Sequence, residues 1–229
     1  MIINGIEKLS LVDYDGVTAC VLFTGGCNFA CPFCHNSPLV YSQNLPVIDN
    51  DEIFEFLIKR KNVLNGVVIT GGEPTLNPDL PEFIAKIKEL GYKVKLDTNG
   101  TNPKMLLQLI EKELVDYVAM DIKNSKEKYA LTAGLKKIDL VPIEESVKIL
   151  MDSVVEYEFR TTLVKEFHEF SDMEKIAEWI NSARKYVLQK FTERETCIKL
   201  GFSEVEKETA QSYCDYLAKY ISTVSLRGY

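Results

Sequence analysis

Residues 18–36 read TACVLFTGGCNFACPFCHN and combine two signals. The first seven residues are apolar and rich in strand-forming side chains, which predicts a buried strand over residues 18–24. The residues that follow place three cysteines, Cys27, Cys31 and Cys34, in one short loop. A loop with unusual chemistry therefore begins where a strand ends.

The same pattern of a short apolar strand, a polar segment and a helix recurs along the chain. It is typical of α/β proteins with a parallel sheet covered on both faces. We count six strand–helix units, fewer than a closed eight-fold barrel has, and expect an open partial barrel or a doubly wound sheet. The expected strands are residues 18–24, 66–70, 92–97, 116–121, 157–164, 186–191 and 222–226, and the expected helices are residues 49–61, 79–90, 103–112, 143–152, 171–183 and 203–220.

Composition and charge narrow the class of protein. The 229 residues are 46% hydrophobic and 27% charged, as in a soluble globular chain that folds without disulfides. With 34 acidic and 27 basic residues the formal net charge is −7, which argues against a general nucleic-acid-binding protein. No apolar run approaches the ~20 residues of a membrane span, and residues 1–5 (MIING) lack the features of a signal peptide. We expect one cytoplasmic domain over residues 1–229, with no nucleic-acid or membrane partner.

The clustered cysteines point to a metal centre, because soft thiolate ligands suit zinc or an iron–sulfur cluster. A four-iron cluster held by three cysteines leaves one iron open, which is useful for binding a substrate or cofactor. Zinc would recruit His35 or a distant cysteine as its fourth ligand, and His35 directly follows Cys34, an awkward position for joint chelation. The scattered Cys20, Cys197 and Cys214 are expected to be buried thiols.

Polar residues that neither surface nor core explains follow the other expected strands. Because the carboxyl ends of parallel strands meet at one mouth, we expect these residues to form one site with the cysteine loop. They are Gly71, Gly72, Glu73, Asp97, Thr98, Asn99, Asp121, Lys123, Arg160 and Gln189.

The segment after the second expected strand suits a ligand that carries an ammonium group. Gly71 and Gly72 let the backbone approach a ligand closely, and Glu73 can present a carboxylate there. The alternative is an ordinary turn between a strand and a helix.

The charges at this mouth must balance one another. Asp97 and Asp121 would repel, so we expect a cation or Lys123 between them. Arg160 lies on an apolar strand and is expected to pair with an anion or a carboxylate. Capping by the two aspartates and a solvent-exposed Lys123 are the alternatives.

Two other residues need no functional explanation. Trp179 is expected to pack in the core from its helix, and His168 is expected to be exposed in a polar loop.

Three motifs resemble those of a known superfamily. Residues 27–34, CNFACPFC, are similar to the cluster signature of the radical S-adenosylmethionine (SAM) enzymes. Residues 71–74, GGEP, resemble that superfamily's GGEP motif, and residues 97–100, DTNG, resemble a motif of the glycyl-radical activating enzymes. Over nearly its whole length the chain most resembles the anaerobic ribonucleoside-triphosphate reductase activating proteins, which are cousins of the pyruvate formate-lyase activating enzyme.

The resemblance implies a (β/α)6 partial TIM barrel of the radical SAM type, with one [4Fe–4S] cluster on Cys27, Cys31 and Cys34. SAM would bind the open iron, accept one electron and break into methionine and a 5′-deoxyadenosyl radical. The expected protein substrate is a glycyl-radical enzyme such as anaerobic ribonucleotide reductase, and a flavodoxin- or ferredoxin-like protein is the expected electron donor.

The resemblance also implies roles for the residues at the mouth. Phe33 and His35 would lie near the adenine, and Gly72 with its neighbours would bind the amino group of SAM. A monovalent cation on Asp97, Thr98 and Asp121 would face its carboxylate. The remaining cofactor contacts would come from Lys123, Arg160 and Gln189.

Two other interpretations of the function stay open. The first is a radical SAM enzyme that acts on a small molecule or a peptide, for example of the deazapurine synthase type. The second is a non-catalytic zinc-binding interaction protein.

Overall fold

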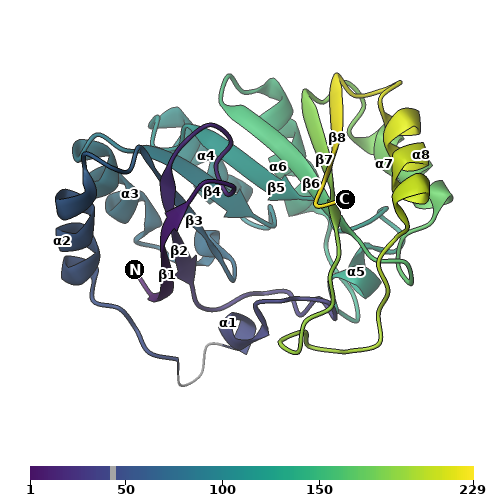
Figure 1. Cartoon of the computed structure of the whole chain (residues 1–229). Helices are drawn as coiled ribbons and strands as arrows, with labels where there is room; N and C mark the ends of the chain where they lie inside the picture. Colours follow the sequence, from purple (N-terminus) through teal and green to yellow (C-terminus); the bar gives the residue numbers. More distant parts are fainter. Residues whose placement is uncertain (42–44) are drawn as a thin grey trace.

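The computed structural model describes residues 1–41 and 45–229. Over these residues the strands form one eight-stranded sheet in the order β1 to β8 (Figure 1). β1 pairs antiparallel with β2, and each later strand pairs parallel with the next. The strands are β1 (Ile3–Ser10), β2 (Ala19–Thr24), β3 (Gly66–Gly71), β4 (Lys93–Thr98), β5 (Tyr117–Asp121), β6 (Glu156–Leu163), β7 (Lys185–Lys190) and β8 (Thr223–Arg227).

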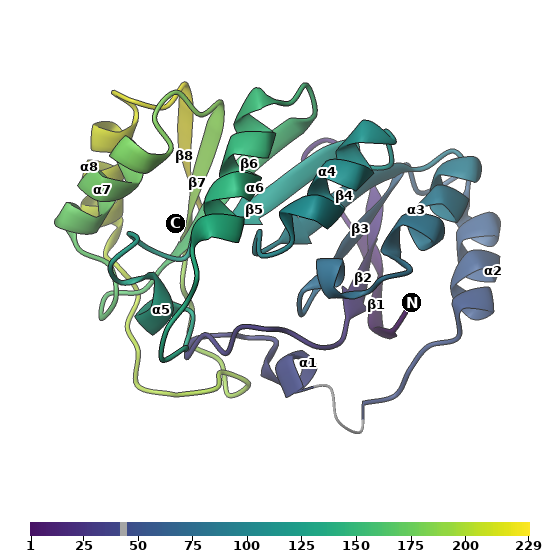
Figure 2. The ribbon, with the colours of Figure 1, turned by 180° about the vertical axis from the view of Figure 1, so that it is seen from behind.

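Helices cover the outer face of this sheet. Seen from behind, α3, α4, α6 and α7 lie in front of the strands (Figure 2). The helices are α1 (Ser37–Tyr41), α2 (Asn50–Arg60), the 3-10 turn η1 (Pro74–Leu76), α3 (Leu80–Glu89), α4 (Pro103–Glu111), α5 (Tyr129–Thr132), α6 (Val141–Asp152), α7 (Phe170–Trp179) and α8 (Lys207–Leu217).

Local signals in the sequence explain where several helices begin. The side chain of Asp49 accepts a hydrogen bond from the backbone N–H of Asp51 (2.8 Å) and caps α2. Asn102 caps α4 in the same way, and Pro103 occupies the first turn, where its missing N–H costs nothing. The turns that join strands to helices are therefore specified by short-range chemistry.

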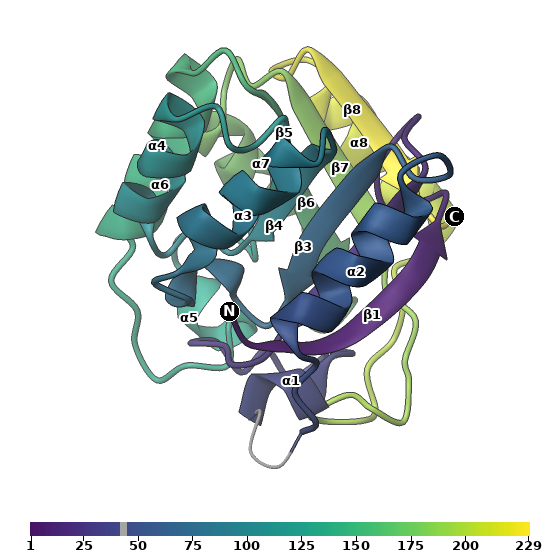
Figure 3. The same cartoon turned by 90° about the vertical axis from the view of Figure 1, so that its left-hand side faces the viewer.

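The expected partial barrel is confirmed. Among the described residues no backbone pairing joins β8 to β1, and the sheet curves so that both edge strands lie toward the same side (Figure 3). Ion pairs bridge the gap, since Asp15 of the β1–β2 loop lies 3.0 Å from Lys185 on β7 and 3.6 Å from Arg227 on β8. Ion pairs of the β1–β2 loop, not strand pairing, therefore connect the two edges of the open barrel.

Side chains alternate between two cores along the parallel strands. Leu22 and Ile69 belong to the large core between the sheet and the helices, whereas their neighbours Val21 and Val68 belong to a small core inside the barrel. Both cores are buried, which explains the apolar strands that the sequence shows.

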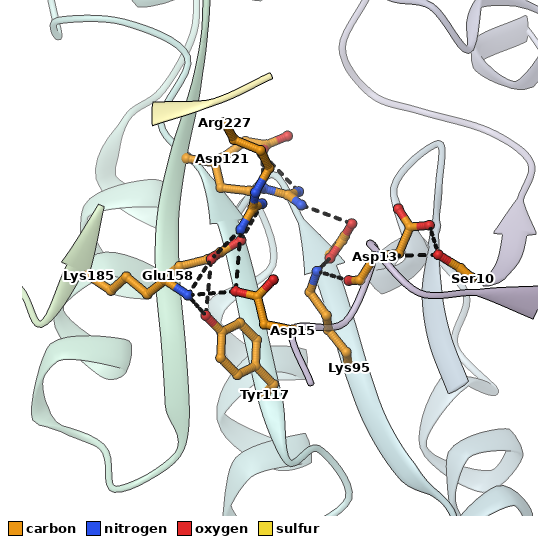
Figure 4. A network of polar contacts seen from close by, with 11 residues as sticks. Ser10, Asp13, Asp15, Lys95, Tyr117, Asp121, Glu158, Lys185 and Arg227 are labelled. Carbon is orange, nitrogen blue, oxygen red and sulfur yellow. Dashed lines mark hydrogen bonds and ion pairs between the residues drawn. The ribbon is translucent and has the colours of Figure 1, made fainter. Parts of the chain in front are cut away.

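Charged residues fill the rest of the barrel interior (Figure 4). Glu158 on β6 is 1% exposed and accepts hydrogen bonds from Arg227 (3.0 and 3.1 Å) and from the Tyr117 hydroxyl (3.1 Å). Lys185 lies 3.1 Å from the same carboxylate. A buried carboxylate is tolerated here because four donor atoms surround it: two guanidinium nitrogens of Arg227, the Tyr117 hydroxyl and the Lys185 Nζ.

The structure contains elements that the sequence patterns did not indicate. β1, α1 and α5 are additions, and α8 starts at Lys207 instead of residue 203. β1 was missed because it is an edge strand whose side chains are mostly half-buried or exposed, so it lacks a continuous apolar run. Trp179 is half-buried at the end of α7 and packs against the main core.

The expectation for His168 was wrong. Its side chain is 3% exposed and lies between the backbone of Val164 and the carbonyl of Lys123. The loop that carries it folds back under the end of β5, a tertiary contact that no local sequence signal announces.

Glu158 should contribute to a pH-dependent stability. Burial alone would raise its pKa, but hydrogen bonds from Arg227 and the charges of Arg160 and Arg227 lower the pKa from 4.5 to about 2. Since the folded pKa lies below the unfolded one, the ionised carboxylate stabilises the fold above pH 4.5, and this contribution is lost as the pH falls toward 2. It amounts to about 3 kcal/mol.

We therefore expect the free energy of unfolding of the metal-free chain, measured by denaturant titration, to fall between pH 5 and pH 2. In Glu158→Gln the fall should be clearly smaller. Glu156→Gln, at an exposed position on the same strand, should behave as the wild type. Equal pH dependence in Glu158→Gln and the wild type would contradict this account.

Candidate functional site

A cavity of about 220 Å³ lies at the carboxyl ends of the parallel strands. We call it the strand-end cavity. Its lining includes the sequence-predicted residues Cys27, Cys31, Phe33, Cys34, His35, Gly71, Gly72, Glu73, Asp97, Thr98, Asn99, Asp121, Lys123 and Arg160. Segments from five strand ends, predicted separately, therefore converge as expected.

Gln189 is the exception among the predicted residues. It lies on β7 in register with Arg227 of β8 and does not line the cavity. Conversely, Phe29, Asn36 and Thr162 line the cavity although the sequence did not single them out. Thr162 follows Arg160 by two positions on β6, so strand periodicity was the signal that would have found it.

Backbone hydrogen bonds hold the cysteine loop from three sides. The N–H of Ala30 donates to the carbonyl of Ala133 after α5 (3.0 Å), and the N–H of Lys199 donates to the carbonyl of Pro32 (2.8 Å). The N–H of Glu73 donates to the carbonyl of Gly26 (2.8 Å). The loop is therefore fixed by segments far away in the sequence.

The three clustered thiols are poor thiolates on their own. Burial raises the pKa of Cys31 to about 12 and that of Cys27 to about 11, and the nearby charge of Lys123 opposes both shifts. Burial also raises the pKa of Cys34. A cationic metal centre would offset this cost, because it stabilises the deprotonated sulfur.

The donor set fits an iron–sulfur cluster. Cys27, Cys31 and Cys34 are free thiols on one cavity wall, and soft sulfur donors of this kind hold such clusters. Within the part of the chain that the structure describes, no group of three or more His, Cys, Asp or Glu side chains has an arrangement that could hold a single metal ion. As expected, Cys20, Cys197 and Cys214 are buried thiols.

Aromatic side chains form the wall beside the third cysteine. His35 stacks on Phe191 at 5.6 Å between ring centroids, and Phe33 packs edge-on against the same ring at 6.1 Å. Burial and the charge of Arg194 lower the pKa of His35, which favours the neutral ring. The buried His35 Nε2 has no hydrogen-bond partner among the described residues. A flat apolar wall with one unused nitrogen suits a heteroaromatic ring.

Gly72 is required where two loops meet. A Cβ at this position would collide with the carbonyl of Gly26 in the cysteine loop. Gly71 has a φ of +112°, a conformation that glycine favours, and a Cβ there would lie 2.5 Å from the backbone nitrogen of Thr24. The glycines thus let the β3 end lie directly against the cysteine loop.

Glu73 ties two strand ends together instead of facing the cavity as a free carboxylate. It is fully buried, and its oxygens accept hydrogen bonds from the Thr98 hydroxyl (2.7 Å), the Asn99 N–H (2.6 Å) and the Thr75 N–H (3.1 Å). Burial raises the pKa of Glu73, and these hydrogen bonds oppose the shift. Asn99 in turn donates to Asn28 (2.8 Å), so the 97–100 segment also contacts the cysteine loop.

The carboxylates at the mouth are separated by a guanidinium group. Arg160 donates to Asp97 (3.1 Å) and to Asp121 (3.0 Å), and Lys123 lies 2.8 Å from the other oxygen of Asp121. Burial alone would raise the pKa of Asp121, but Lys123 and Arg160 outweigh it and lower the pKa to about 2. The expected pairing of Arg160 with a carboxylate is therefore present twice.

His168 supports Lys123 from behind. Its Nε2 lies 2.9 Å from the carbonyl of Lys123, and its Nδ1 lies 3.1 Å from the backbone N–H of Val164. The neutral ring with a proton on Nε2 satisfies both contacts, in accord with the pKa lowered by burial. His168 thus fixes the backbone at the β5 end.

Comparison with known proteins identifies the family. The family model of the radical SAM superfamily matches residues 21–180. The chain belongs to the radical SAM superfamily. This family implies a [4Fe–4S] cluster and SAM, in agreement with the thiols and the polar strand-end cavity.

Individual radical SAM relatives differ in their named activities. A Methanocaldococcus jannaschii protein provisionally named a glycyl-radical enzyme activating enzyme is 35% identical over 83% of this chain and 80% of its own length. A GTP 3′,8-cyclase of Helicobacter pylori is 31% identical over 65% of this chain, which spans only 47% of the cyclase.

Solved structures share the radical SAM fold at low identity. Streptococcus suis SuiB bound to the precursor peptide SuiA is 15% identical with a TM-score of 0.70, covering 91% of this chain and 48% of SuiB. TYW1 with a lysine-pyruvate adduct is 17% identical with a TM-score of 0.66, covering 89% of this chain and 75% of TYW1. No helix in the described part of the chain has the length and apolar character needed to span a membrane.

The contact between the two glycine-containing loops yields a prediction. Gly72→Ala should push the cysteine loop away and destabilise the metal-free chain by about 1–3 kcal/mol, the usual range for overpacking. Chemical denaturation measures this loss. Gly5→Ala is the matched control, because a Cβ there meets only ordinary contacts at 3.6 Å or more. A Gly72→Ala variant as stable as the control would show that the loops are not in direct contact.

Proposed function

We propose that this radical SAM enzyme generates a glycyl radical on a partner protein. One observation carries the proposal: three cysteine thiols and the charged strand ends line the same cavity, in a chain 35% identical to a protein provisionally named an activating enzyme. When bound, the reduced cluster supplies the electron that cleaves the sulfonium of SAM.

Different residues of the cavity would bind the cluster and the separate parts of SAM. Cys27, Cys31 and Cys34 hold a single cluster, and Phe33 and His35 contact the adenine of SAM. The backbone around Gly71 and Gly72 accepts its ammonium group, and the cations Lys123 and Arg160 face its carboxylate. The other predicted residues that line the cavity position these groups, and a direct contact of any of them with SAM stays an untested prediction: Glu73, Asp97, Thr98, Asn99 and Asp121. The role of Gln189 also stays an untested prediction.

A protein substrate is compatible with the open edge of the barrel. A glycine-bearing loop needs lateral access to the cavity, and the sheet is not closed by pairing of β8 with β1 in the described residues. We propose anaerobic ribonucleotide reductase as the partner and a flavodoxin- or ferredoxin-like protein as the electron donor. Cytoplasmic location, operation without oxygen, a single domain over residues 1–229 and a monovalent cation at Asp97 and Asp121 stay predictions from the sequence.

A second candidate is a radical SAM enzyme with a small-molecule or peptide substrate. The likeness to a GTP 3′,8-cyclase and the shared fold with SuiB, solved with a precursor peptide, support keeping it. Identifying the product, a glycyl radical on a protein or a modified small molecule or peptide, separates the two candidate functions.

The cluster assignment predicts a clean division among the six cysteines. After anaerobic reconstitution and reduction, the protein should contain about four irons and cleave SAM slowly to 5′-deoxyadenosine without any partner. Cys27→Ala, Cys31→Ala and Cys34→Ala should lose iron and activity. Cys20→Ala, Cys197→Ala and Cys214→Ala should keep both. One zinc and no iron in the wild type would instead support the zinc-binding alternative.

The partner assignment has its own test. Reduced protein, SAM and a candidate glycyl-radical enzyme should give a glycyl radical by electron paramagnetic resonance, with one 5′-deoxyadenosine formed per radical. A partner whose target glycine is replaced by alanine is the control. Abundant 5′-deoxyadenosine without a radical on any candidate, but with turnover of a small molecule or peptide, would favour the second candidate.

A further inference from the structure

Lys95 is a buried cation that no sequence motif singled out. It lies on β4, two residues before Asp97, so both side chains point into the barrel. The Lys95 side chain is 6% exposed, its Nζ donates to the carbonyl of Asp13, and Nζ lies 3.4 Å from Asp97 Oδ1. Asp97 Oδ1 is buried and accepts no hydrogen bond within the described residues, so the Lys95 charge is its nearest compensation.

Asp97, Arg160, Asp121 and Lys123 form the floor of the cavity. Lys95 does not line the cavity itself, but it extends this floor into a row of alternating charges on or directly after three neighbouring strands. Figure 4 labels Lys95 and Asp121 of this row. The order of the row is Lys95, Asp97, Arg160, Asp121 and Lys123. Each of the four carboxylate oxygens faces a cationic nitrogen at 3.4 Å or less. Three cations against two carboxylates leave the row with one net positive charge.

This arrangement disfavours an added metal cation. Sodium and potassium bind through oxygen ligands, and the carboxylate oxygens are already turned toward nitrogens. A fourth positive charge beside three others would also be repelled in a partly buried site. Glu158 does not change this balance, because Arg227 and Lys185 pair with it.

We propose that Lys95 is a positioning residue that takes the place of a bound monovalent cation. Its ammonium holds Asp97 in position and gives the floor the positive charge that an anionic ligand group needs. The proposal rests on the proposed function in taking the carboxylate of SAM as that group. Binding of SAM to this chain should then be independent of sodium and potassium.

The first test uses the metal-free chain and needs no SAM. Thermal unfolding is followed in KCl, NaCl and tetramethylammonium chloride at equal ionic strength. The wild type should unfold at the same temperature in all three salts. Lys95→Met, of similar length but uncharged, should gain a saturable stabilisation in KCl or NaCl, because the vacated position then accepts a cation. Selective stabilisation of the wild type by sodium or potassium would overturn the proposal.

The second test is SAM titration of the reconstituted protein in the same salts. Lys95→Met should bind SAM about tenfold more weakly in tetramethylammonium, and potassium or sodium should restore much of the loss. Lys95→Arg should retain the charge and the cation independence. Lys93→Met, at an exposed position on the same strand, is the matched control and should bind as the wild type.

The outcomes separate this inference from the proposed function. Unchanged, cation-independent SAM binding in Lys95→Met would overturn the role of Lys95 while leaving radical SAM chemistry intact. A wild type that binds no SAM would count against the proposed function, and the unfolding temperatures would still decide whether the chain holds a cation. Should Lys95→Met fail to fold, the salt response of the wild type and of Lys95→Arg decides the question.

Discussion

The structure of the site depends on the guanidinium group of Arg160. It lies between two carboxylates that would otherwise repel each other, and it bonds to Asp97 on β4 and Asp121 on β5 from its own place on β6. Three strand ends are thereby held at one spacing. The cysteine loop can then lie against a floor of fixed charge, because Gly72 allows close approach and Asn99 reaches Asn28.

Much of the fold could be predicted from the sequence because its signals are local. Apolar strands and capped helices follow from periodicity and from residues such as Asp49 and Pro103. The site could be predicted for a related reason. In a parallel sheet, the order of the chain alone brings strand ends to one mouth, so residues that follow strands become neighbours without any knowledge of the packing.

What escaped prediction depends on contacts between distant segments. His168 looks like a loop residue until its loop folds under β5, and Glu73 looks available until Thr98 and Asn99 enclose it. Lys95 looks like an exposed strand lysine, since the β1–β2 loop that buries it is 82 residues away. Gln189 differs from the other predicted residues, because it lies near a strand end but does not line the cavity, and its contact with SAM stays a prediction.

The proposed function requires that Cys27, Cys31 and Cys34 hold a cluster with one iron free to bind SAM. Electron paramagnetic resonance of the reduced, reconstituted protein, recorded before and after addition of SAM, tests it most directly. We expect a cluster signal whose g-values change when SAM is added, because SAM would bind the open iron. A signal that SAM leaves unchanged, or the absence of any cluster signal in iron-loaded protein, would contradict it.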